Sequence, residues 1–157
     1  MREVTSELAA LTPVGRELEM QAGVKVMERL EGMGTLPVGG AVITPGGDLS
    51  ASFIIHAVIQ SPEQAIAPEG VRLGLLNGLR RATEWGIETL GVPPMGCGAG
   101  NLDAETTASV MVPLIREHMM TASLPREVTV AVANEYEEEA FTRIIELACG
   151  EAPARDM

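Results

Sequence analysis

A glycine-rich loop near the middle of the chain carries the residues best suited to chemistry. Three glycines stand there at alternate positions, between a short apolar run and a helical segment. Glycine tolerates positive φ and lets a ligand approach the backbone closely. Successive amide groups, with the positive end of a following helix, can hold an anion. The residues expected to bind phosphate are Gly96, Cys97, Gly98, Ala99, Gly100 and Asn101. A plain glycine-rich turn without a ligand is the competing interpretation.

The spacing in this loop excludes two familiar phosphate-binding motifs. No Lys-Ser or Lys-Thr pair follows Gly100, as a Walker A loop requires. The spacing G-x-G-x-G differs from the dinucleotide-binding fingerprint, and it follows the third strand-like run of the chain instead of the first.

Composition narrows the class of partner. The formal net charge of -11 argues against binding to duplex nucleic acid or to an anionic membrane surface. Phosphate remains an allowed ligand, because backbone amides can hold it without basic side chains. The two cysteines lie far apart in sequence, so neither a zinc site nor a disulfide framework is expected. No metal or cofactor is predicted. No signal peptide or membrane-spanning run is evident, which predicts a cytoplasmic location.

The pattern along the chain predicts alternating strands and helices. Thr12-Pro13 is typical of a helix start, followed by one bent helix or two short ones broken at Gly23. Further elements follow; the strands are expected at 40–44, 51–59, 88–92 and 127–133, and the helices at 68–85, 103–121 and around Phe141. The run 127–133 is interpreted as a central strand. Residues 1–150 are expected to form one domain, with a frayed tail at 151–157.

This order of elements indicates a mostly parallel sheet covered by helices. Ligands of such sheets bind at the carboxyl ends of the strands. The loops 60–68, 93–102 and 134–138 are therefore the ones expected to form a site.

Several motifs resemble those of macro domains. The run Pro93-Pro94-Met95-Gly96-Cys97-Gly98-Ala99-Gly100 is similar to that family's phosphate-binding loop, P-x-[ILM]-G-[ST]-G-x-G. The segments 36–46 and 53–58, with His-Ala-Val in the second, resemble two of its strands, and the likeness extends over 36–147. The resemblance implies a three-layer α/β/α sandwich with a mixed, mostly parallel sheet. It also implies ADP-ribose or a related phosphorylated nucleotide as ligand.

The chain departs from the family near its N-terminus. The usual first strand, with its Gly-Asp-Ile-Thr motif, is not found, and the Asn-Ala-Ala-Asn element is replaced by Arg2-Glu3-Val4-Thr5-Ser6. Residues 11–15 stand where Gly-Gly-Gly-Val is usual. These changes weaken the case for an ADP-ribosyl hydrolase. A missing outer strand leaves a bare sheet edge, which predicts a homo-oligomer. An oligomeric structural remnant without nucleotide binding is the rival hypothesis.

A few single residues allow two interpretations. Cys97 precedes a helix and is either a nucleophile or a small packing residue. His56 and His118 would be the candidate bases for such a nucleophile, or else they are histidines packed in the core. In the resembled family, residues after the last strand line the ribose and adenine side of the cleft. Asn134 and Tyr136 are placed there by the resemblance, or else belong to a surface loop. Two further residues are expected at the helix that follows the glycine loop: Asp103 as an N-cap or a first-turn carboxylate, and Asn101 as either a cap or a phosphate contact.

Overall fold

The computed structural model describes residues 1–98 and 101–150. The predicted frayed tail lies outside the described residues. In chain order the elements are β1 (Arg2–Thr5), α1 (Pro13–Ala22), α2 (Val24–Gly32), β2 (Ala41–Pro45), β3 (Phe53–Gln60), α3 (Pro68–Glu84), β4 (Thr89–Val92), α4 (Ala104–Thr121), β5 (Glu127–Val130) and α5 (Glu135–Gly150).

The strands form a mixed sheet in two hydrogen-bonded parts. In the first, β3 lies between β1, which is parallel to it, and β2, which is antiparallel. In the second, β4 and β5 pair in parallel. The parts meet where the amino group of Met1 donates to the Gly91 carbonyl oxygen at 2.7 Å. The edge of β4 therefore faces β1 without a full ladder between them.

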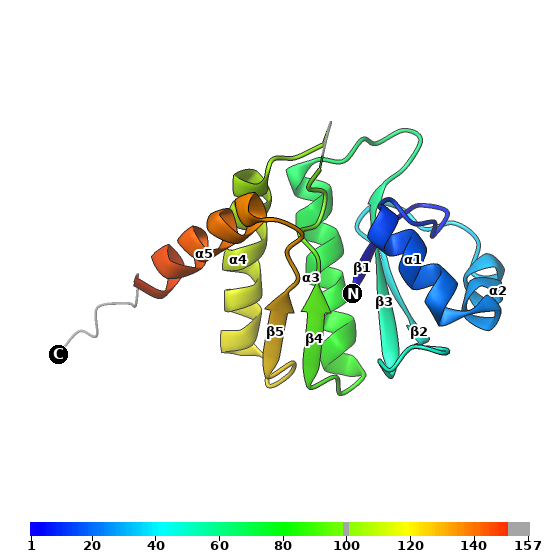
Figure 1. Ribbon diagram of the computed structural model, residues 1–157. Coiled ribbons are helices and arrows are strands. Elements are labelled where there is room, and N and C mark those ends of the chain that lie inside the picture. The colour runs from blue at the N-terminus through cyan, green and yellow to red at the C-terminus, as the bar shows by residue number, and fades with distance from the viewer. Residues whose placement is uncertain (99–100, 151–157) are drawn as a thin grey trace.

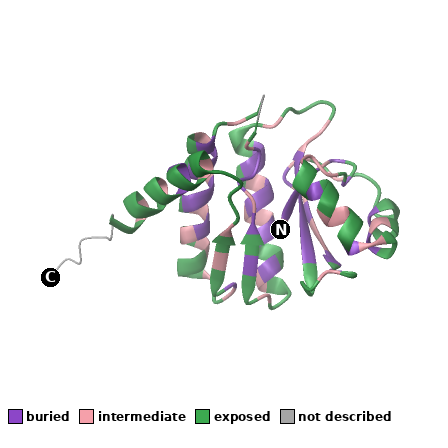
Figure 2. Cartoon of the chain, in the orientation of Figure 1, coloured by how far each residue is buried: buried purple, intermediate pink, exposed green. Residues whose placement is uncertain are grey.

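Helices cover both faces of the strands, so the fold has three layers (Figure 1). On one face α3 and α4 pack on β3, β4 and β5, and the core there includes Ile55, Leu75 and Met111. On the other face α1 and α2 cover the first part of the sheet through a smaller core around Val26 and Val58. The predicted α/β/α sandwich is confirmed. Figure 2 shows that β3 is largely buried, as its continuous apolar run predicted.

Local signals explain where the first helices begin and end. The Thr12 hydroxyl accepts a hydrogen bond from the Gly15 amide at 3.0 Å, and Pro13 occupies the first helical position. Gly23 has φ 96°, a left-handed conformation that favours glycine and ends α1. The chain then continues as α2, so the predicted interruption at Gly23 is confirmed as two short helices.

The position of β5 differs from the prediction. Its sequence was interpreted as a central strand, but in the described residues it pairs with β4 alone and lies at the edge. Glu127 and Thr129 are exposed, whereas Val128 and Val130 are half-buried. Alternation of this kind indicates that one face is covered, and it carries no information about how many neighbours a strand has.

Among the described residues, no helix has the length and apolarity needed to cross a bilayer.

Candidate functional site

The glycine-rich loop lies at the carboxyl edge of the strands, as predicted. It leaves β4 after Val92 and runs to the start of α4 at Ala104, next to the connection between β3 and α3 (Figure 1). The Asp103 carboxylate accepts a hydrogen bond from the Thr106 amide at 2.7 Å. Asp103 is thus the N-cap of α4, which confirms that prediction.

Two glycines give the loop its shape for different reasons. Gly96 has φ 76°, and a Cβ there would lie 2.9 Å from methyl groups of both Ile66 and Val71. The close approach of these two side chains therefore requires glycine. Gly98 has φ 146° and open space where its Cβ would be. The backbone at Gly98 is consequently accessible to a ligand from outside.

Hydrogen bonds within the protein occupy the described amides of this loop. The Gly96 amide donates to Glu3 Oε2 at 2.5 Å. Cys97 and Gly98 donate to the carbonyl oxygens of Pro94 and Leu102, each at 3.3 Å, beyond the usual range for a good N–H···O bond. A ligand oxygen could accept hydrogen bonds from these two amides at a small cost in free energy, because the internal bonds that would be lost are long. Ala99 and Gly100, also predicted to bind phosphate, lie outside the described residues.

Asn101 closes the turn of the loop. Its amide donates to the Gly98 carbonyl oxygen at 3.0 Å, and the following Leu102 amide donates to Gly96 at 3.0 Å. The structure thus assigns the Asn101 backbone to holding the turn, while its side chain is exposed. A phosphate contact from that side chain stays a prediction.

Acidic side chains surround the loop. Glu3 is buried, and desolvation raises the pKa of its carboxyl from 4.5 to about 7, against the lowering effect of the Gly96 hydrogen bond. The charge of Glu137 contributes to this rise in the pKa of Glu3. Asp103 adds a third carboxylate near Cys97. The local charge therefore opposes an anion, and protonation of Glu3 relieves part of that opposition.

Cys97 lacks the environment of a nucleophile. Burial raises the pKa of its thiol to about 11, and the neighbouring carboxylates of Glu137, Glu3 and Asp103 raise it in the same direction. The two histidines lie elsewhere, in the contacts described below. The structure therefore favours the interpretation of Cys97 as a small packing residue.

Asn134 and Tyr136 lie at the start of α5. The Asn134 side chain accepts a hydrogen bond from the Glu137 amide at 2.9 Å, and Glu137 in turn accepts one from the Ala133 amide at 2.7 Å. This reciprocal arrangement resembles a capping box and fixes the helix start. Tyr136 is 61% exposed, so its ring is free to meet a ligand. A role for either residue in binding ribose or adenine stays a prediction.

A buried polar network holds β1 in place below the loop. Arg2 Nε donates to His56 Nδ1 at 2.8 Å, and another guanidinium nitrogen of Arg2 contacts Glu19 at 2.5 Å. His56 Nε2 lies 2.9 Å from the Thr44 hydroxyl. Burial, together with the charge of Arg2, lowers the pKa of His56 to about 3. His56 is therefore a neutral core residue, as one of its two interpretations had it.

His118 also has a structural environment. Its Nε2 lies 3.0 Å from the Thr83 hydroxyl and 3.1 Å from the Leu124 carbonyl oxygen. These contacts tie α4 to the end of α3 and to the turn before β5. Among the described residues, no group of three or more His, Cys, Asp or Glu side chains is arranged to hold a metal ion.

Sequence reasoning missed Glu3 as a residue of this site. In the sequence the stretch Arg2–Ser6 stands out only because it lacks the asparagine element, and nothing there assigns a role to Glu3. The signal available was an acidic residue flanked by residues of a buried-looking strand. Its partner, Gly96, is 93 positions away, so only the fold reveals the contact.

Comparison with known proteins decides the family. The model of the macro domain family matches residues 4–111. The chain belongs to the macro domain family. This macro domain is 37% identical over 117 residues to an uncharacterized protein of Aeropyrum pernix, a match covering 69% of the chain and 54% of that protein. It is 25% identical over 118 residues to a macro domain-containing protein of Caldanaerobacter subterraneus, covering 74% and 67%.

Solved macrodomains share the fold of this one. The Oceanobacillus iheyensis macrodomain with ADP gives a TM-score of 0.82 at 18% identity, covering 95% of this chain and 83% of that one. The Trypanosoma brucei macrodomain in complex with ADP-ribose gives 0.81 at 15% identity, covering 92% and 61%. The chain spans between 54% and 60% of the length of the first three curated relatives that it matches.

Proposed function

We propose that this macro domain binds ADP-ribose or a related phosphorylated nucleotide at the carboxyl edge of its strands, with the phosphates on the loop 95–102. The observation that carries the proposal is the backbone at Gly98, which has positive φ and open space outside it, in the loop between β4 and α4. Helix N-termini and turns of this kind suit anionic oxygens. Two solved neighbours contain ADP or ADP-ribose, which agrees with this ligand class.

Binding requires the loop to exchange partners. The amides of Cys97 and Gly98 would leave their 3.3 Å internal bonds for shorter, charge-assisted bonds to phosphate oxygens. The Gly96 amide stays with Glu3, which supports the loop from inside.

Protonation of Glu3 would favour the bound state. With a pKa of about 7, this carboxyl is largely neutral in mildly acidic solution and largely charged in basic solution. A phosphate group nearby disfavours the charged form further. We therefore expect affinity to fall as the pH rises through 7.

Calorimetric titration with ADP-ribose tests the proposal. Micromolar affinity corresponds to about -8 kcal/mol, and we expect the parent protein to reach that range. In Gly98→Glu, the new carboxylate would occupy the open space beside the loop and repel phosphate, so binding should be lost. Gly34→Glu is the matched control, because Gly34 also has positive φ and open space around it but lies after α2. Equal loss in both variants would contradict the assignment to this loop.

One observation favours a second function, that of a structural module: carboxylates surround the loop, and its described amides form hydrogen bonds within the protein. Glu3, Glu137 and Asp103 surround it, and its described amides have partners within the protein. This arrangement suits a structural, oligomeric module that binds no nucleotide. An absence of heat with ADP-ribose at both about pH 6 and about pH 8, on either side of the Glu3 transition, would favour this second function.

A further inference from the structure

A polar pocket lies at the same edge of the sheet as the glycine-rich loop. Its walls come from the residues that follow β1, the segment before β2 and the loop that follows β3. In Figure 1 these segments meet at the upper edge of the strands. The volume of the pocket is about 440 Å³, which lies within the range of small-molecule sites. Nothing in the proposed phosphate site uses it.

Ser6 is the buried polar residue of this pocket, which we call the Ser6 pocket. Ser6 is 9% exposed, and its backbone is fixed on two sides. Its amide donates to the Gln60 carbonyl oxygen and its carbonyl oxygen accepts from the Leu36 amide, each at 2.8 Å. Its hydroxyl has no partner among the described residues, where no side-chain oxygen is sealed from solvent without one. The hydroxyl therefore opens into the pocket with its donor and acceptor sites available.

Two carboxylates add negative charge to the Ser6 pocket. Glu7 and Glu63 line it, and its lining contains no Lys or Arg. Neither carboxylate forms an ion pair within the described part of the chain. Glu63 accepts a hydrogen bond from the Ser61 hydroxyl at 3.3 Å, which leaves most of its acceptor sites free. The pocket therefore attracts a positively charged group.

The shape of the lining suits a guanidinium group. Among the described residues, no three metal-ligating side chains are grouped, which argues against a metal ion. A guanidinium is planar and has five N–H donors, and carboxylates and hydroxyls on several sides of the pocket can accept them. Leu36, Pro37 and Val38 form an apolar part of the wall. The aliphatic stem that carries a guanidinium can pack there.

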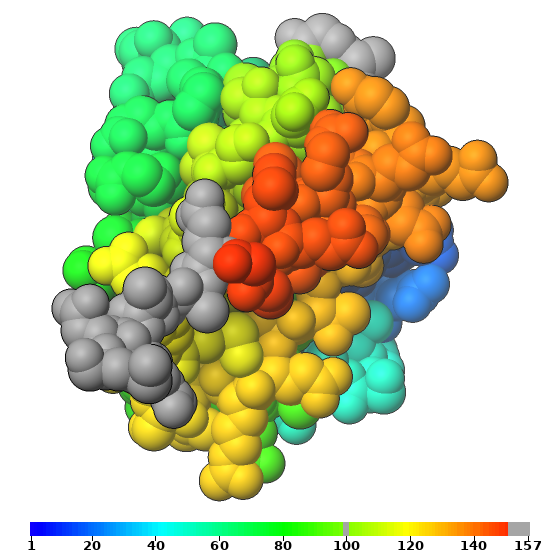
Figure 3. Space-filling view, turned by 90° about the vertical axis from the view of Figure 1, so that its left-hand side faces the viewer, coloured from blue at the N-terminus to red at the C-terminus, as the bar shows by residue number. Residues whose placement is uncertain are grey.

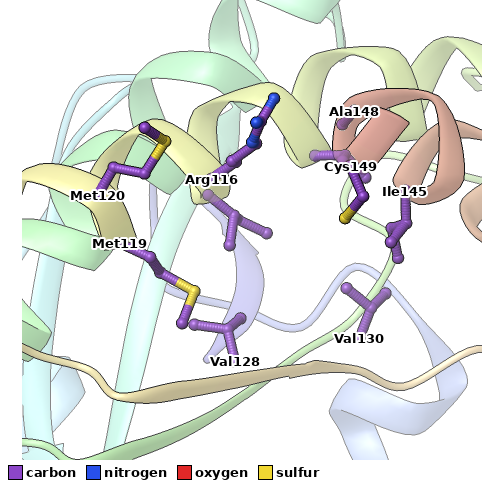
Figure 4. A pocket seen from close by; sticks show the side chains of 10 residues that line it. Arg116, Met119, Met120, Val128, Val130, Ile145, Ala148 and Cys149 are labelled. Carbon is purple, nitrogen blue, oxygen red and sulfur yellow. The ribbon is translucent and has the colours of Figure 1, made fainter. Parts of the chain in front are cut away.

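Another hollow of the surface has the opposite chemistry. It lies between α4, β5 and α5, on the side of the molecule that Figure 3 shows, with α5 in orange and red. Figure 4 shows that the side chains around it are nearly all apolar, and the charged one that it labels is Arg116. A guanidinium there would lose water beside a like charge and gain no counter-charge from the described lining. Cation binding is therefore expected in the Ser6 pocket and not in this groove.

The loop after β3 connects the Ser6 pocket with the glycine-rich loop. Ser61 and Gln64 line the pocket, and Ile66 packs against Gly96 a few residues later. β1 lies between β3 and β4, and adjacent strands are about 5 Å apart, so about 10 Å separate the ends of β3 and β4. A single ligand of ordinary size could thus reach both sites.

We propose that the Ser6 pocket binds a guanidinium group, carried by a small molecule or by an arginine side chain of a polypeptide. The Ser6 hydroxyl and the carboxylates of Glu7 and Glu63 hold the guanidinium, and the apolar wall holds its stem. This inference goes beyond the proposed function, because the pocket needs no phosphate on the glycine-rich loop. It adds a positive group to the description of what the domain recognises.

NMR titration of the backbone amides with N-acetyl-arginine amide tests the proposal. We expect saturable shifts at the amides of Leu36 and Gln64 at millimolar concentrations of the probe. N-acetyl-citrulline amide has the same shape without the positive charge and should cause no such shifts. Gly98→Glu should still bind the arginine probe, so a failure of the phosphate assignment is distinguishable from a failure of this one.

Variants in the pocket locate the binding. Ser6→Ala should weaken binding of the probe about threefold through loss of one hydrogen bond. Glu7→Gln combined with Glu63→Gln should weaken it about tenfold, because two ion pairs at an exposed site are lost. Glu138→Gln with Glu139→Gln, at exposed positions on α5, removes the same charge and should leave the affinity unchanged. Circular dichroism checks that each variant is folded.

A blocked tripeptide with arginine in the middle separates the two sources of the guanidinium. Affinity equal to that of the single residue supports an arginine of a polypeptide, and weaker affinity supports a small molecule in the same pocket. Equal shifts from the arginine and citrulline probes would overturn the proposal. So would an affinity that is unchanged when Glu7 and Glu63 are both replaced, or shifts confined to other parts of the protein.

Discussion

The pKa of Glu3 makes a direct prediction about stability. The side chain is buried under the glycine loop and accepts the Gly96 hydrogen bond through one oxygen. In Glu3→Gln, an amide oxygen can accept the same bond, and the shape of the side chain is kept. The variant therefore removes the titration of this group and little else.

The sign and size follow from proton linkage. The pKa of Glu3 rises from 4.5 to about 7 on folding, chiefly through desolvation. Between these two pH values the folded protein binds more protons than the unfolded chain, so its free energy of unfolding falls as the pH rises. The full effect is about 3 kcal/mol and is complete above the folded pKa. Glu3→Gln should thus be more stable than the parent by up to about 3 kcal/mol near pH 8, and equal to it near pH 4.5.

Urea unfolding at about pH 4.5, 6 and 8 measures this difference directly. Glu31→Gln, the same change at an exposed position on α2, should show no such trend and controls for the general loss of a negative charge. A constant difference between Glu3→Gln and the parent over the whole range would refute the reasoning. It would mean that water reaches the carboxyl and that burial leaves its pKa unchanged.

The loop makes two further predictions. Gly96→Ala should lower the free energy of unfolding, measured in urea, by more than about 2 kcal/mol, because strain at φ 76° adds to a clash with two packed methyl groups. If Gly34→Ala lowers the free energy of unfolding by the same amount, the clash at Gly96 is absent. The raised pKa of the Cys97 thiol predicts that iodoacetamide at about pH 8 alkylates the exposed Cys149 before Cys97. Mass spectrometry of the digested protein measures the two rates, and faster labelling of Cys97 would restore it as a candidate nucleophile.

Elements with local signals could be predicted from the sequence. Thr12-Pro13, Gly23 and Asp103 mark helix boundaries through bonds to residues only a few positions away, and all three are found where expected. The macro domain assignment rested on motifs in the correct order, and the family match confirms it. The fold class followed from the alternation of strands and helices, because a parallel sheet requires such crossovers.

Features that depend on distant contacts could not be predicted. The alternation around Val128 and Val130 is the same in an edge strand and in a central strand, so the prediction that β5 is a central strand was wrong. Glu3 could not be connected with Gly96, since the contact exists only after β1 lies beside β4. The roles of the loop residues in ligand binding stay predictions, because backbone amides have the same chemistry in every sequence.

The network around Arg2 constrains how this protein can change over time. The guanidinium only donates, so Nδ1 of His56 must be unprotonated, and Nε2 must carry the proton toward the Thr44 hydroxyl. Each member therefore satisfies a buried group of another. Replacing one alone leaves an orphaned polar atom, which costs about 1–3 kcal/mol. Viable descendants should replace Arg2 and His56 as a pair, so the two positions form one inherited unit although 54 residues separate them.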